Sequence, residues 1–208
     1  RSDAVAEADS SNIHAKSKPL GLPPNGLQGL LCCAGMACCI AMAVPQAHIV
    51  AHATDLGHVA RRGAEMLALM LATGTISRLL FGWISDRIGR LPTLYVALTF
   101  EVLAFVMFAK SSSLVSLYIA AAIFIAGSSA ATSLNPAIIA DNFGRRYIGT
   151  ITGISFAIAG SAAAVGPLLA GLIREATGTY EMAFQLGAGL NIAAILLLTI
   201  LRRPSRRS

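Results

Sequence analysis

Two ionisable side chains, Arg78 and Glu101, lie inside long apolar runs, where charges are rare. A charge deep inside a membrane helix costs at least ~2.5 kcal/mol, so it normally faces a cavity or a partner. The guanidinium of Arg78 can hold a carboxylate through two parallel hydrogen bonds. Arg78 therefore predicts an anion site inside a helical bundle, and an arginine that snorkels to the lipid headgroups is the alternative.

Glu101 lies at a depth similar to that of Arg78. Arg78 precedes Ser85, the predicted end of its run, by roughly 10 Å along a helix. Glu101 follows Pro92, the predicted start of the next run, by a comparable length. We expect Glu101 to be either a charge partner of Arg78 or a proton site, and the spacing leaves both open.

Polar residues also cluster where the first apolar run ends, around Gln46 and His48. His48, His52 and Asp55 are spaced four and three apart, so they share one helix face. No further metal ligand on another element is evident, and we predict no metal. The pattern favours polar groups that line a mouth, with His48 as a possible proton exchanger near neutral pH. Asn135, before Pro136, is a further candidate to line the same path.

The sequence shows no catalytic arrangement. It has no G-x-S-x-G elbow, no phosphate-binding glycine loop and no H-E-x-x-H motif. The four cysteines all fall in the first apolar run, and they are predicted to be free packing residues. We therefore expect neither an enzyme nor a cofactor.

Composition indicates an integral membrane protein. Apolar residues make up 55% of the chain and charged residues 12%, and the mean hydropathy is +0.69. Soluble domains carry about a quarter charged residues. The charges separate apolar runs near the ~20 residues that cross a bilayer as helix. We expect an all-α bundle over 27–201, with spans near 27–50, 64–85, 92–109, 114–136, 148–173 and 183–201.

The basic residues predict the orientation. We expect Arg61, Arg62, Lys110 and Arg174 on the side of the membrane opposite to the two chain ends. Nearly all of the other lysines and arginines are expected on the same side as the chain ends. Positive charge favours the cytoplasm, so both ends are predicted to be cytoplasmic. Residues 1–26 are expected to be a flexible linker and 202–208 a basic tail. Because the basic residues flank the spans, nucleic acid is not an expected partner. The chain begins with Arg1, so we expect it to be part of a longer protein.

The charged loop after the second span carries a recognisable pattern. Residues 82–90 read GWISDRIGR, or G-x-x-x-D-R-x-G-R. This pattern resembles the signature loop between the second and third helices of each half of major facilitator superfamily transporters. The stretches 44–57 (VPQAHIVAHATDLG), 143–154 (FGRRYIGTITGI) and 176–180 (ATGTY) are similar to the monocarboxylate and oxalate–formate branch. The resemblance covers residues 27–203.

The resemblance implies the C-terminal six-helix half of a twelve-helix carrier in the plasma or inner membrane, with an N-terminal half that this sequence does not contain. Arg78 falls where that branch carries an arginine implicated in binding the substrate carboxylate. The loop residues implied to form a conformational latch are Gly82, Asp86, Arg87, Gly89 and Arg90. Oxalate-type members carry a lysine in the fifth span, whereas this chain has Ala159 there, which favours a monocarboxylate over oxalate.

The sequence thus predicts secondary active transport of small organic anions, monocarboxylates above all, by alternating access across the lipid bilayer. A co-transported proton or a counter-anion would drive it. Two alternatives stay open. One is a major facilitator carrier of a different substrate, such as a drug or a sugar. The other is a six-helix membrane partner protein that does not transport.

Overall fold

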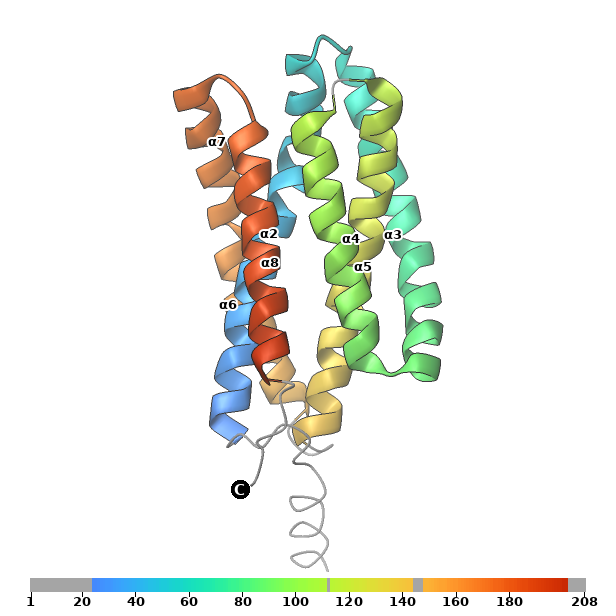
Figure 1. The fold of residues 1–208 in the computed structure, drawn as a ribbon, viewed down its shortest axis with the longest axis vertical. Helices are drawn as coiled ribbons and strands as arrows, with labels where there is room; N and C mark the ends of the chain where they lie inside the picture. The colour runs from blue at the N-terminus through green and yellow to red at the C-terminus, as the bar shows by residue number, and fades with distance from the viewer. Residues whose placement is uncertain (1–23, 112, 144–147, 202–208) are drawn as a thin grey trace, which may run out of the picture.

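The computed structural model describes residues 24–111, 113–143 and 148–201, and these form a bundle of long helices (Figure 1). The helices are α2 (Pro24–Asp55), α3 (Ala60–Ile88), α4 (Arg90–Lys110), α5 (Leu114–Phe143), α6 (Ile148–Ala163), α7 (Val165–Thr177) and α8 (Glu181–Leu201). They provide six segments long and apolar enough to cross a membrane, with α6 and α7 sharing one. The predicted all-α fold with six spans is confirmed. The tail at 202–208 and most of the predicted linker lie outside the described residues.

The helices run roughly along one axis, and α2 begins near the place where α8 ends (Figure 1). We call this the terminal end of the bundle, and the other the opposite end. Helix α5 packs against α3 and α4, while α2 packs against α3, α6, α7 and α8. Contacts between α4 and α8 join the two groups. A helix pairs most of its backbone N–H and C=O groups within itself, as a lipid environment requires.

Proline explains the one interruption within a span. Pro167 lacks a backbone N–H, and its ring clashes with the carbonyl four residues earlier, that of Ala163. The helix breaks there, between Ala163 and Val165. The segment Gly149–Thr177 is still long and apolar enough to be one membrane span, with this break inside it. Pro45 and Pro136, in contrast, lie inside α2 and α5, which run on through them.

The buried side chains form two apolar clusters. The larger one lies toward the opposite end and includes Phe105, Phe108, Phe124 and Phe184, which are essentially inaccessible. Phe108 stacks on Phe184 with ring centroids 5.3 Å apart. The smaller cluster lies toward the terminal end and includes Phe81, Ala97, Leu98, Ala130, Ala131 and Leu198. The bundle is therefore packed at two levels along its axis.

A glycine allows α4 and α5 to approach closely. A Cβ on Gly127 of α5 would lie 2.5 Å from the carbonyl oxygen of Ala97 and 3.1 Å from the backbone nitrogen of Glu101. Real Cβ atoms do not approach backbone so closely, so only glycine fits. In lipid, helices gain contact through such small residues because no hydrophobic drive holds them together.

Candidate functional site

Helix α3 presents two exposed flanks of different chemistry. Leu69, Ile76, Leu80 and Trp83 follow one another along the first, and all are exposed. Thr75, Arg78, Gly82 and Asp86 follow one another along the second at spacings of three or four residues. Arg78 is exposed, and Ile88, the last residue of α3, lies roughly 15 Å further along the axis. We call this second flank, Thr75–Arg78–Gly82–Asp86, the polar flank.

Arg78 and Glu101 occupy different surroundings. Glu101 is fully buried, whereas Arg78 makes no ion pair or hydrogen bond with any residue that the structure describes. The two side chains are therefore not paired in this conformation. The guanidinium of Arg78 is left available to a group from outside this bundle.

Glu101 lies next to a thiol and an amide. The Cys38 thiol donates to its carboxyl group, with Sγ 3.7 Å from Oε2 and 3.9 Å from Oε1. The Asn191 carboxamide is also fully buried, and neither of its polar atoms has a hydrogen-bond partner within the described residues. All four cysteines are free, as the sequence predicted.

Asn135 lines a cavity of about 60 Å³ near the terminal end. The walls come from α2, α4, α5, α6 and α8 and are largely apolar, with Cys38, Cys39 and Thr132 among their few polar groups. Ala159, in the fifth span, also lines it. The cavity therefore carries no charged side chain among its lining residues.

His48 ties three segments together near the opposite end. Its Nε2 lies 3.0 Å from the carbonyl oxygen of Pro167, which can only accept, so Nε2–H is the donor. In the neutral imidazole Nδ1 is then the acceptor, and the Tyr180 hydroxyl donates to it at 3.0 Å. Burial raises the pKa of the Tyr180 phenol, so it keeps its proton at neutral pH. Gln46, by contrast, is exposed.

The predicted face of His48, His52 and Asp55 is confirmed, because all three lie around Tyr180 and its neighbours. The His52 ring packs edge-on against Tyr180, with centroids 5.9 Å apart. Asp55 accepts two hydrogen bonds from Arg174, at 2.7 and 2.6 Å, and the Arg174 guanidinium lies 5.5 Å from the centre of the Tyr180 ring. A cavity of about 220 Å³ adjoins these groups.

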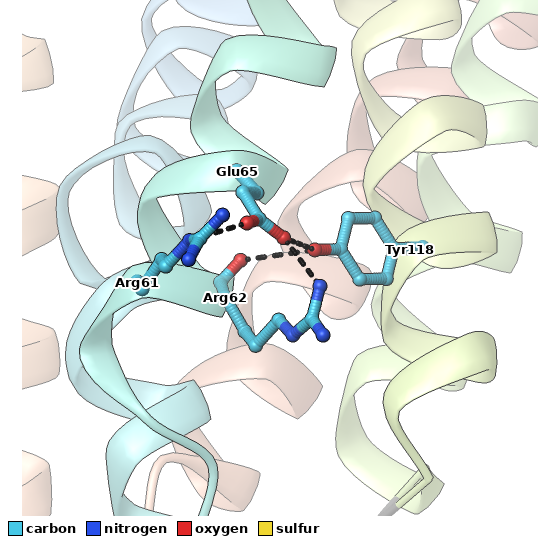
Figure 2. Close-up of polar contacts among 4 residues, drawn as sticks. All are labelled: Arg61, Arg62, Glu65 and Tyr118. Atoms are coloured by element: carbon cyan, nitrogen blue, oxygen red, sulfur yellow. Dashed lines mark hydrogen bonds and ion pairs between the residues drawn. The ribbon is translucent and has the colours of Figure 1, made fainter.

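A second polar network at the opposite end was not anticipated from the sequence. Figure 2 shows Arg61, Arg62 and Tyr118 gathered around the carboxylate of Glu65. Arg61 Nε and Arg62 Nη1 lie 3.0 and 2.8 Å from its oxygens, and the Tyr118 hydroxyl donates to it at 2.9 Å. The network joins α3 to α5. Spacing within α3 could have indicated the ion pairs, but Tyr118 lies too far along the chain for any spacing rule.

The predicted latch loop makes the turn from α3 to α4. Gly89 has φ +94°, a conformation that favours glycine, and its N–H donates to the Ser85 carbonyl at 3.0 Å. Asp86 is exposed, and the Arg87 guanidinium lies 4.2 Å above the Trp83 ring. A Cβ on Gly82 would meet nothing within 4 Å among the described residues. Arg90 begins α4 and is half-buried.

Comparisons with known proteins agree on one family. Residues 27–208 match the family model described as the Major Facilitator Superfamily. The chain is 29% identical over 164 residues to monocarboxylate transporter 13 of Rattus norvegicus, covering 76% of this chain and 37% of the rat protein. It is 27% identical over 176 residues to an MFS-type transporter of Gibberella moniliformis, covering 84% of this chain and 42% of the fungal protein.

A solved structure shares the fold. The crystal structure of an auto-inhibited POT family peptide transporter superposes with a TM-score of 0.72 at 14% identity, over 87% of this chain and 38% of the transporter. The chain thus spans less than half the length of the relatives it matches.

Proposed function

The chain belongs to the major facilitator superfamily, and from this we propose that it is one half of a membrane carrier that moves small organic anions, with monocarboxylates as substrates. Two halves that rock around a site near the bilayer midplane would expose that site to each side in turn. The partner would be an N-terminal six-helix half, since the relatives are more than twice as long as the matched region. The carrier would lie in a plasma or inner membrane with both ends of this segment cytoplasmic.

The position of Arg78 supports this proposal most strongly. A charged side chain on an exposed surface deep in a membrane helix is costly against lipid. The cost disappears if the polar flank faces water or the other half of the carrier. The other exposed flank of α3, which carries Leu80 and Trp83, would then face lipid. A guanidinium there matches a carboxylate in charge and in hydrogen-bond geometry.

A single cationic side chain in the middle of the membrane favours a substrate with a single carboxylate. Among the described residues, the other lysines and arginines lie near helix ends, and α6 and α7 contribute only Arg174, close to the end of α7. A dicarboxylate bound at Arg78 would leave its second charge without a partner in this half. The relatives named monocarboxylate transporter 13 in rat and cattle support the same choice.

Other residues have supporting roles in the proposal. Gln46, His48 and Asn135 would border the path, and His48 would also hold α7 against α2 through Pro167. The loop residues Asp86, Arg87 and Arg90, with Gly82 and Gly89, would close the terminal end against the other half. The driving force would be a proton or a counter-anion.

Uptake by the full-length protein in proteoliposomes tests the proposal. We expect labelled lactate to enter, and oxalate to enter poorly. Arg78→Gln should lower lactate uptake at least about tenfold, because hydrogen bonds to charged groups contribute about 1.5–3 kcal/mol. Arg78→Lys should restore part of it. The matched control is Arg61→Gln on the same helix, whose exposed pair with Glu65 contributes little.

The outcomes separate the alternatives. Lactate uptake that Arg78→Gln leaves unchanged would remove Arg78 from the site. A protein that inserts but carries neither lactate nor oxalate would contradict an organic-anion carrier and favour a neutral substrate.

A further inference from the structure

A thin polar layer separates the two apolar clusters of the bundle. It consists of Cys38 on α2, Glu101 on α4 and Asn191 on α8. Along α4, Ala97 and Leu98 belong to the smaller cluster, and Ala104 and Phe105 belong to the larger one. Along α8, Ala188 and Leu198 divide in the same way on either side of Asn191. Glu101 thus lies between apolar layers, far from both ends of its helix.

Among the described residues, no positively charged side chain pairs with Glu101. Within the described part of the chain it takes part in no ion pair, and its hydrogen-bond donor is the Cys38 thiol. The titratable group that contacts it is the thiol of Cys38 on α2. Helices α5 and α8 present the backbone of Gly127 and the amide of Asn191. Thiols and amides cannot neutralise a carboxylate.

A cavity adjoins this layer on the side of the terminal end. The cavity of about 60 Å³ near the terminal end is lined by Cys38 and Cys39, with Thr132 and Asn135 as further polar groups. It has room for more than one water molecule, because one water needs about 10–15 Å³. The Cys38 thiol therefore stands between this cavity and the carboxyl group of Glu101.

We propose that Glu101 is a proton-binding site of the carrier, separate from the anion site at Arg78 and reached through the cavity that Cys38 lines. This inference rests on the proposed function. In the conformation seen here the carboxyl would hold its proton, since an unpaired carboxylate is unfavourable in such surroundings. When the bundle opens, water in the cavity takes the proton. A water molecule becomes hydronium, the carboxyl O–H bond breaks, and the electron pair stays on the carboxylate.

The separation of the two sites determines how they would be coupled. Arg78 and Glu101 do not touch, so the proton would not be exchanged through an Arg78–Glu101 pair. Anion binding at Arg78 and proton binding at Glu101 would instead shift the same equilibrium between the closed and the open arrangement of the bundle. This shared equilibrium would couple the two sites. Loss of the proton site should then uncouple transport from pH and leave anion affinity in place.

Full-length protein in proteoliposomes, with labelled lactate as the probe, tests this. Net uptake driven by an acidic exterior requires proton release inside, whereas lactate exchange at equal pH does not. Glu101→Gln, which resembles the protonated carboxyl in shape, should abolish the stimulation by the pH gradient. Exchange and the KM for lactate should stay within about threefold of wild type. The control Glu65→Gln removes a carboxylate outside the layer and should keep the stimulation.

Stimulation that persists in Glu101→Gln would overturn the proposal, as would a wild-type protein that exchanges lactate without any response to the gradient. If wild type carries no lactate at all, the proposed function fails instead. Infrared spectroscopy then tests the proton site independently of transport. It also tests the site if Glu101→Gln does not fold. We expect a carbonyl band of a protonated carboxyl that shifts in Cys38→Ser, because a hydroxyl is a stronger donor than a thiol. Absence of such a band, or a band that Cys38→Ser leaves in place, would contradict the proposal.

Discussion

Arg78 and Glu101 both lie well inside membrane-length helices, yet the fold exposes one and buries the other. The sequence points to both residues as candidates, because a charge within an apolar run is visible without a structure. It could not decide whether they pair, since depth along a helix says nothing of rotation about the helix axis. The structure supplies that rotation and places them in separate surroundings.

Tyr180 is a residue that the sequence reasoning did not select as a site residue. Its hydroxyl donates to His48, and its ring contacts His52 and lies near Arg174. These partners come from α2 and α7, at sequence distances that no spacing rule connects. The same holds for Tyr118 beside Glu65. Long-range partners of this kind follow from packing and not from local pattern.

The bond between Tyr180 and His48 should contribute measurably to stability. Tyr180→Phe removes the donor and leaves Nδ1 of His48 without its partner, so the free energy of unfolding should fall by about 1 kcal/mol. The change can be measured by denaturant unfolding of the full-length protein in detergent. Tyr95→Phe is the matched control, because the buried Tyr95 hydroxyl has no hydrogen-bond partner within the described residues. Equal losses in both variants would contradict this role for Tyr180.

At the scale of helices, the apolar runs predicted the six spans, and the structure adds where one of them is interrupted. Each span is visible from length and hydropathy, and the turn at Gly89 from the loop pattern. The break at Ala163 depends on the ring of Pro167, whereas Pro45 and Pro136 leave their helices continuous. Proline in a run shows where a break can occur.

The contact between α4 and α5 depends on Gly127. Gly127→Ala places a Cβ against the Ala97 carbonyl, so the helices must separate and stability should fall by about 1–3 kcal/mol. Because Glu101 lies at the same contact, the variant also tests how tightly the polar layer is held. Thermal unfolding of the full-length protein measures the loss.

The control is Gly189→Ala on α8, where a Cβ would meet nothing within 4 Å. There, alanine should be neutral or stabilise by up to about 1 kcal/mol through helix propensity. A Gly127→Ala protein as stable as Gly189→Ala would show that the close approach is not required.

At the scale of the whole molecule, the polar flank of α3 is not covered by any part of the chain that the structure describes. Arg78 and Asp86 are exposed there, and Gly82 meets nothing. Membership of the major facilitator superfamily gives this surface a reason, because carriers of this family are built from two halves around a shared site. The proposed anion site would therefore be completed by residues outside this sequence. No sequence analysis of this chain could have named them.

Direct binding of a monocarboxylate tests the central claim most simply. Calorimetric titration of lactate into the purified full-length protein measures affinity without needing transport. We predict a saturable binding heat in wild type and in Arg61→Gln, and a Kd at least about tenfold higher in Arg78→Gln, which corresponds to about 1.4 kcal/mol. Equal affinity for lactate in wild type and Arg78→Gln would contradict an anion site at Arg78.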